Sequence, residues 1–375
     1  MSREESGMTG AEKRTEETRL IVQGWFDSPL QMANSLPDDV RNSVLRVTGA
    51  SARSYREVLL TICVATARDP EYRATSKFYA CNPRPLYEDG IRPVLEGLGI
   101  PCTQSGPLNI AKATVAIDSS WAAQRSPQWA AEDTLVVLHY LEGNVSKADE
   151  VAVELCRLMF AEAIDIDQMK SAVDGPERLD HLGNLCVRLI REATDGGNTA
   201  QRVCGYMLEE SLASSNLSVS GVTDSASTTN ATSKKPGDLA VEDQEGKILR
   251  IFEVTTKGFT PQRISECSQS LRTFEADSGQ TLPTVSVICE RANVPEIARE
   301  IDSGGFLGLV ADGPINYEFT EIEGWIYQML FNLADVQRVR FFTQLQNYVN
   351  EPNTRKEVKE RFVALLGEAE LTSPS

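Results

Sequence analysis

The sequence predicts a mixed α/β protein in which a helical N-terminal domain precedes a domain that contains a β-sheet. Three observations favour this fold class. The chain has 375 residues, which is enough for two domains of ordinary size. Apolar residues recur at the helical spacing of 3.6 over residues 1–195, whereas segments after residue 236 alternate with a period of 2. Between the two patterns lies a stretch with one charged residue and no aromatic residue, 214–233.

A helical domain is expected over residues 1–197. Within it, a capping box formed by Ser54 and Glu57 marks the start of one helix. Gly99 and Pro101 mark the end of another, because glycine favours a left-handed C-cap and proline cannot continue a helix. The predicted helices of this domain span residues 11–26, 38–45, 55–67, 85–98, 134–139, 149–164 and 178–193.

A mixed α/β domain is expected over residues 198–375, beginning with an amphipathic helix at 199–212. The nearly uncharged stretch 214–233 is predicted to be a flexible loop by its composition. Residues 238–242 and 247–255 are predicted to be strands joined by a turn. Further strands are expected at 284–289 and 306–310, and helices at 260–274, 295–301, 321–347 and 355–366.

Charge and cysteine content exclude several classes of protein. The formal net charge is −17, from 37 basic and 54 acidic residues, so the chain cannot coat nucleic acid by bulk charge. The polar N-terminus lacks the apolar core of a secretory signal, and no stretch is apolar enough to span a membrane. The eight cysteines form no CxxC pair and there are two histidines, which indicates free thiols in a reducing cytoplasm and no local zinc site.

Three charged residues around the predicted hairpin form a candidate catalytic site. Side chains alternate along a strand, so Glu253 and Lys257 share one strand face and Asp238 can meet Glu253 across the hairpin. Two adjacent carboxylates repel each other, which favours binding of a hard cation such as Mg²⁺. Such a cation stabilises charge on a scissile phosphate, and Lys257 could orient the attacking water. This set of groups suits phosphodiester hydrolysis.

Neighbouring residues could complete the site. The preceding helix carries Glu209 and Glu210, of which Glu210 is a candidate third metal ligand and Glu209 a supporting residue. Thr255 lies on the same strand face as the catalytic glutamate. Gln269 follows Arg263 by two i,i+3 steps on the next helix, which predicts that both face the site. The candidate DNA-binding residues are Lys234, Lys235, Arg263, Asn109 and Lys112.

The order Pro236-Gly237-Asp238, Glu253 and Lys257 resembles the PD-(D/E)xK nuclease motif. It departs from that motif in two places: Gly237 separates the proline from the aspartate, and Lys257 stands four residues after the glutamate. More broadly, the layout is similar to the restriction endonuclease family typified by SacI, in which a helical half precedes a Gly-Asp…Glu-Val-x-x-Lys core. The matching pieces outside the core are Arg53-Ser54-Tyr55, Arg84-Pro85-Leu86 and Pro107-Leu108-Asn109.

The resemblance implies a PD-(D/E)xK nuclease domain over residues 198–375 and a type II restriction endonuclease. Such an enzyme is a Mg²⁺-dependent hydrolase that cuts double-stranded DNA at a defined sequence, here expected to act as a cytoplasmic homodimer. It needs a cognate DNA methyltransferase as its genetic partner, because host DNA must be protected. The helical domain would then serve DNA recognition or dimerisation.

Two alternatives stay open at the level of sequence. The first is a defence or repair nuclease of the same fold that cuts without sequence specificity. The second is a catalytically silent DNA-binding protein on that fold, which the shifted position of Lys257 favours. A surface hairpin can also produce an Asp…Glu-x-x-x-Lys pattern by chance, since a short motif is only a hypothesis.

Overall fold

The chain divides into two compact units. A computed structural model describes residues 9–28, 36–168, 175–176, 178–224, 236–295, 298 and 305–371. The division falls between Gln168 and Met169, and each unit is described here by itself. The sequence predicted the boundary at residue 197. The difference comes from α11 (Leu179–Glu192), whose buried apolar residues belong to the core of the second unit, beside α15 and α17.

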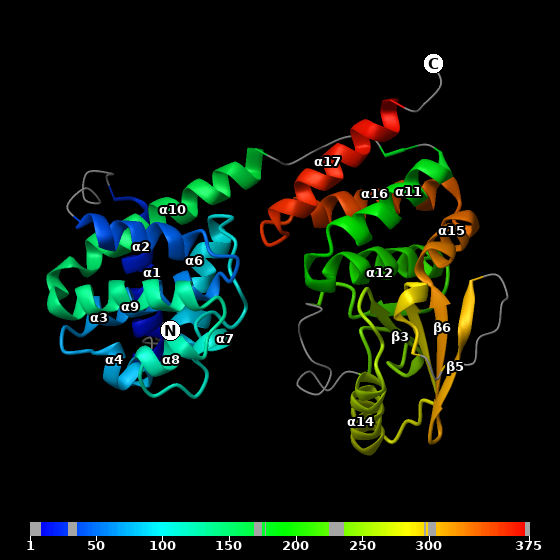
Figure 1. Ribbon diagram of the computed structural model, residues 1–375, viewed down its shortest axis with the longest axis horizontal. Coiled ribbons are helices and arrows are strands. Elements are labelled where there is room, and N and C mark those ends of the chain that lie inside the picture. Colours follow the sequence, from blue (N-terminus) through cyan, green and yellow to red (C-terminus); the bar gives the residue numbers. More distant parts are fainter. Residues whose placement is uncertain are drawn as a thin grey trace, which may run out of the picture. The chain divides into compact units, whose positions relative to one another are not determined.

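The described part of the first unit is helical throughout (Figure 1). Its central element is α3, which is buried along nearly its whole length, from Ser54 to Thr66. A helix buried on all sides is largely apolar, and α3 is so from Val58 to Ala65, with Thr61 as the one polar residue. Its buried charged residues are paired, Arg56 with Glu162 and Glu57 with Thr103. The helices are α1 (Gly10–Phe26), α2 (Asp38–Thr48), α3 (Ser54–Arg68), α4 (Ala74–Lys77), α5 (Pro83–Pro85), α6 (Arg92–Gly97), α7 (Leu108–Ala111), α8 (Ser119–Ala123), α9 (Gln128–Gly143) and α10 (Ala148–Gln168).

The predicted helix at 85–98 contains a π-helical turn at Leu86–Ile91. Pro93 causes this irregularity, because it has no N–H group to donate to the carbonyl of Asp89 and its ring crowds that carbonyl. The freed Asp89 oxygen instead accepts hydrogen bonds from Arg19, at 3.1 Å from Nε and 2.9 Å from Nη2. A side chain of α1 therefore replaces the missing backbone donor.

The second unit combines helices with a mixed sheet (Figure 1). None of the helices in the described ranges is long and apolar enough to cross a membrane. The remaining helices are α12 (Asn198–Leu212), α14 (Pro261–Ser278), α15 (Ile322–Asn332), α16 (Asp335–Asn350) and α17 (Lys356–Leu371). The strands are β1 (Ser218–Ser220), β2 (Leu239–Glu242), β3 (Ile248–Thr255), β4 (Thr284–Cys289), β5 (Phe306–Asp312) and β6 (Ile315–Glu321).

The six strands formed by the described residues follow the order β1-β2-β3-β4-β6-β5. β3, β4 and β6 are parallel, whereas β1, β2 and β5 join the sheet by antiparallel pairing. The outer strand β5 carries a bulge between Phe306 and Gly308, where its register against β6 shifts. β3 and β4 are the two middle strands, and the chain passes from one to the other through α14. Because β2 runs antiparallel to β3, the start of β2 lies beside the end of β3.

The sheet is buried on both faces. On one face Ile251 and Val287 form a core with α14, and on the other Phe252 and Val254 form a core with helices that include α12 and α15. Residues 251–254 of β3 are accordingly apolar except for Glu253. A carboxylate at 2% exposure inside such a strand requires a specific reason, because desolvating a charge is costly.

Several expected elements differ from the structure. The predicted loop 214–233 contains β1, whose Ser218 pairs with Glu242 of β2, while residues 225–233 lie outside the described ranges. β6 was not predicted, although its alternating burial follows the period of 2 that marks a strand. The helix predicted at 295–301 falls mostly outside the described residues. The capping box is also absent, because the N-cap of α3 is Arg53 and no side chain caps that helix.

Candidate active site

The structure brings Asp238 and Glu253 together. Leu239 pairs with Phe252, so Asp238, the residue before β2, stands next to Glu253 of β3. The Asp238 carboxylate accepts a hydrogen bond from the Val254 N–H at 2.9 Å and is in hydrogen-bonding contact with the Glu253 carboxyl group. Burial raises the pKa of Asp238, because the charged form is poorly solvated there. The two carboxyl groups thus form one pair, in which Glu253 is buried and Asp238 is half-buried.

Two glycines allow the backbone to approach this pair closely. Gly221 has a φ of +89°, and a Cβ there would lie 2.1 Å from the Asp238 carbonyl oxygen. A Cβ on Gly237 would lie 2.3 Å from the Cγ2 atom of Ile251. An added Cβ would therefore clash at both positions, most severely at Gly221, where it would meet backbone.

Gln201, on the N-terminal half of α12, is a site residue that the sequence did not reveal. Its Nε2 donates to the carbonyl oxygen of Gly221 at 2.6 Å and lies 3.5 Å from that of Asp238. Its Oε1 is buried and has no hydrogen-bond partner among the described residues. The only signal in the sequence is a polar residue within the buried stretch Thr199–Leu208 of a helix.

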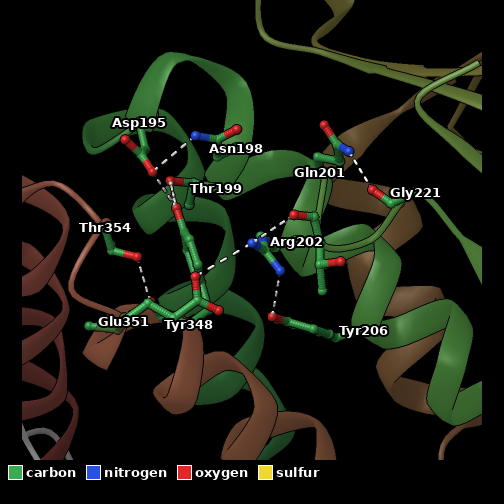
Figure 2. A network of polar contacts seen from close by, with 12 residues as sticks. Asp195, Asn198, Thr199, Gln201, Arg202, Tyr206, Gly221, Tyr348, Glu351 and Thr354 are labelled. Carbon is green, nitrogen blue, oxygen red and sulfur yellow. Dashed lines mark hydrogen bonds and ion pairs between the residues drawn. The ribbon is translucent and has the colours of Figure 1, made fainter. Parts of the chain in front are cut away.

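A polar network fixes this end of α12 against α16, as Figure 2 shows. Nη2 of Arg202 donates to the Thr223 carbonyl oxygen at 3.1 Å, and the guanidinium lies over the Tyr348 ring, 5.4 Å from its centre. The Tyr348 hydroxyl donates in turn to the Asp195 carboxylate at 3.0 Å. Because Arg202 follows Gln201, these contacts also set the position of Gln201 beside the backbone of Gly221 and Asp238.

The cation beside the pair is Arg263 of α14. Its Nη2 lies 3.3 Å from Oε2 of Glu253, and its Nη1 donates to Oγ1 of Thr255 at 2.9 Å. The guanidinium also lies over the ring of Phe259, 5.2 Å from the ring centre. Three different groups thus hold the arginine at the end of β3. This position agrees with the prediction that Arg263 faces the site.

The predicted placement of Lys257 on the strand face of Glu253 is wrong. β3 ends at Thr255, whose hydroxyl accepts from the Lys257 N–H at 3.0 Å and donates to the Lys257 carbonyl oxygen at 3.1 Å. This local turn ends the alternation of side chains, so the four-residue spacing no longer keeps Lys257 in line. The Lys257 side chain is exposed.

Glu209 and Glu210 do not join the pair, which corrects a second prediction. They lie more than two helical turns beyond Gln201, about 12 Å along α12. Glu210 forms an ion pair with Arg340 at 2.8 Å, and Glu209 accepts from Gln344 at 3.2 Å, both on α16. Burial raises the pKa of Glu209, and the charge of Glu210 adds to this. These carboxylates attach α12 to α16.

The face of α14 that meets the pair differs from the predicted one. Gln269 is exposed, and so is Glu266, which bonds Gln262 at 2.9 Å. Cys267 lies beside Glu253 instead, one turn after Arg263, and burial raises the pKa of its thiol. The sequence held a signal for this face, because Ile264, Cys267 and Leu271 recur at helical spacing along α14 and are buried.

The remaining predicted DNA contacts lie outside the described residues or in the other unit. Lys234 and Lys235 lie outside the described residues. Asn109 and Lys112 belong to the first unit. The Asn109 amide donates to Ser54 at 3.1 Å and to Thr103 at 2.9 Å, and Lys112 is exposed.

A pocket of about 860 Å³ begins beside Gly237 and runs along the β2–β3 hairpin to the end of α14. The charged residues among its described lining are Glu242, Glu245 and Lys247.

No family model and no curated protein matches this chain. The function must therefore be inferred from the geometry of the site.

The carboxylate pair fits a magnesium ion. Mg²⁺ prefers oxygen ligands and is bound by one or two carboxylates together with waters and substrate phosphate. Asp238 and Glu253 supply two such carboxylates, whereas no group of three or more His, Cys, Asp or Glu side chains that could hold a metal occurs within the described ranges.

Proposed function

We propose that the protein is a Mg²⁺-dependent nuclease that hydrolyses phosphodiester bonds in double-stranded DNA at a specific sequence, as a type II restriction endonuclease. The observation that carries this proposal is the pair formed by Asp238, just before β2, and Glu253 of β3, which is 2% exposed. A protein gains no stability from placing a buried carboxylate against a second one, which favours a role in binding a cation.

Each residue at the pair has a distinct role in this proposal. Asp238 and Glu253 would hold the cation, which supplies a Lewis acid and a water of lowered pKa when bound. The Val254 N–H keeps the Asp238 carboxylate in a fixed orientation. Arg263 carries a positive charge next to Glu253, where it can pair with a phosphate. Lys257 is assigned to contact with the DNA backbone, because it is exposed on the turn after β3.

Cleavage of supercoiled plasmid tests the proposal. Wild type with Mg²⁺ should convert the plasmid to discrete linear fragments, and EDTA should prevent this. Glu253→Gln should reduce the rate at least about 100-fold, because it removes a charged metal ligand. Glu266→Gln is the matched control, since Glu266 is an exposed glutamate on α14, and it should cut as wild type does. Unchanged plasmid with wild-type protein, across DNA from several sources, would overturn the proposal.

The pattern of products tests sequence specificity. Discrete bands support restriction at a defined site, whereas a smear would indicate a nuclease that cuts without specificity. A specific enzyme that cuts both strands is proposed to act as a homodimer in the cytoplasm, with a DNA methyltransferase encoded nearby to protect host DNA. Light scattering with and without DNA would measure the oligomeric state.

A second candidate function is catalytically silent DNA binding on the same fold. The observation that favours it is the exposed Lys257, which leaves the pair without the lysine that the motif expects. Calorimetry with Mg²⁺ separates the two functions. Binding that disappears in Asp238→Asn supports the nuclease, whereas DNA binding without any Mg²⁺ binding supports the silent protein.

A further inference from the structure

Arg263 of α14 lies against one oxygen, Oε2, of the Glu253 carboxylate. The Nη2–Oε2 distance is 3.3 Å, and the Glu253 side chain is 2% exposed against 30% for Arg263. Thr255 and Phe259 hold the same guanidinium independently of the glutamate. The arginine would therefore stay at the mouth of the site even if its bond to Glu253 were broken.

Glu253 would offer a divalent cation a carboxylate that already holds a cation. The guanidinium of Arg263 lies 3.3 Å from Oε2 of Glu253, next to Asp238. A divalent cation that binds both carboxylates would draw on the oxygens of Glu253, where the guanidinium now lies. Arginine and metal are therefore alternative partners for the same carboxylate.

We propose that Arg263 is the resident counter-ion of the carboxylate pair, which the divalent cation must displace from Glu253 in order to bind. The displaced guanidinium keeps its contacts with Thr255 and Phe259 and presents its free N–H groups to a phosphate of the substrate. Metal binding thereby creates the phosphate contact. This inference rests on the proposed function, because it assumes that the pair binds Mg²⁺.

Titration of Mg²⁺ into the full-length protein by calorimetry tests the displacement. Arg263→Met removes the charge and keeps a long apolar side chain, so it should bind Mg²⁺ about 10-fold more tightly than wild type, equivalent to about 1.4 kcal/mol. Arg272→Met is the matched control on α14, where the arginine is 60% exposed and pairs only loosely with Asp312, at 4.0 Å. Its Mg²⁺ affinity should equal that of wild type.

Thermal melting provides a second measurement. Without metal, Arg263→Met should melt below wild type, since the pair has lost its counter-ion. With saturating Mg²⁺ the melting temperature should rise more in Arg263→Met than in wild type. Arg263→Lys serves if the methionine variant does not fold: its ammonium cannot bridge Glu253 and Thr255 as a guanidinium does, so it should bind Mg²⁺ with intermediate affinity.

The outcomes separate this inference from the proposed function. Equal or weaker Mg²⁺ affinity in a folded Arg263→Met would overturn the displacement while leaving the nuclease intact. If Arg263→Met binds Mg²⁺ more tightly than wild type but the wild-type protein cuts no DNA, the displacement is supported and the nuclease is rejected. Absence of Mg²⁺ binding in wild type and in both Arg263 variants would reject both.

Discussion

At the scale of single residues, burial decides the chemistry of the site. Asp238 and Glu253 are ordinary acids in the sequence, and strand pairing places them side by side, with Glu253 buried and Asp238 partly exposed. The sequence showed that they could meet, since the hairpin and the alternation of side chains were both legible. It did not show that Lys257 leaves the strand, because the hydroxyl of Thr255 forms a local turn that competes with the extended backbone.

We expect Asp238→Asn to abolish Mg²⁺ binding while stabilising the metal-free protein at pH 7. The pKa of Asp238 is raised on folding, so its carboxyl favours folding at low pH and opposes it increasingly as the pH rises above its ordinary value near 3.9. The gain should be on the order of 1 kcal/mol at pH 7 and shrink toward pH 4. Urea unfolding in EDTA at the two pH values measures it. An equal loss of stability at both would contradict this account.

Gln201→Met should weaken both stability and Mg²⁺ affinity. Methionine matches the volume of glutamine but cannot donate to the carbonyl oxygens of Gly221 and Asp238, which would remain buried. We expect a loss of about 1–3 kcal/mol in the free energy of unfolding and a severalfold weaker Mg²⁺ affinity. Gln262→Met, on an exposed position of α14, is the control and should change neither quantity. A destabilised variant with unchanged Mg²⁺ affinity would limit Gln201 to a structural role.

At the scale of elements, the pair is held by β1, which packs against β2, and by α12, which packs against β1 and β3. Gly221→Ala should cost about 3 kcal/mol, because it adds a steric clash with the Asp238 carbonyl to the strain of a left-handed backbone. Gly246→Ala separates the two effects: its φ is +77° but nothing lies within 4 Å of the added Cβ, so about 1 kcal/mol is expected. Denaturant unfolding of both variants measures the difference. Equal losses would show that no close contact exists at Gly221.

The attachment of α12 to α16 makes a further prediction. Glu210→Gln should lower the free energy of unfolding by about 1 kcal/mol, because it breaks the ion pair with the half-exposed Arg340 at a position where the Glu210 side chain is 7% exposed. It should leave Mg²⁺ affinity unchanged, because Glu210 lies far along α12 from the pair. Calorimetry and thermal melting on the same variant measure both effects. A 10-fold loss of Mg²⁺ affinity would restore Glu210 as a metal ligand.

The elements of the second unit show what sequence patterns can and cannot predict. The hairpin, β4 and the helix after β3 were located to within a few residues, because each has a clear period. β1 was missed because three residues at the edge of a sheet need little apolar character. Glu209 and Glu210 were misplaced for another reason: periodicity gives the face of a helix but not the point along it that meets the sheet.

At the scale of the whole molecule, the site lies entirely within the second unit. Gln201, Asp238, Glu253 and Arg263 all follow residue 168. A fragment of residues 169–375 should therefore unfold cooperatively and bind Mg²⁺ as the full chain does, since the unit has its own core. A fragment that starts at 198, the boundary predicted from sequence, should aggregate or melt at least about 10 °C lower. It lacks α11, which packs on α15 and α17. Comparable stability of the two fragments would contradict this division.

The bulge in β5 bears on how two copies of the chain could associate. The strand order leaves β1 and β5 at the margins of the sheet, where unpaired backbone groups can recruit a strand from another molecule. β1 is only three residues long, and the irregular stretch at Phe306–Gly308 breaks the regular row of donors and acceptors along β5. Continuous pairing of strands between subunits is thus disfavoured at either margin, and a homodimer would be built from helical or loop surfaces.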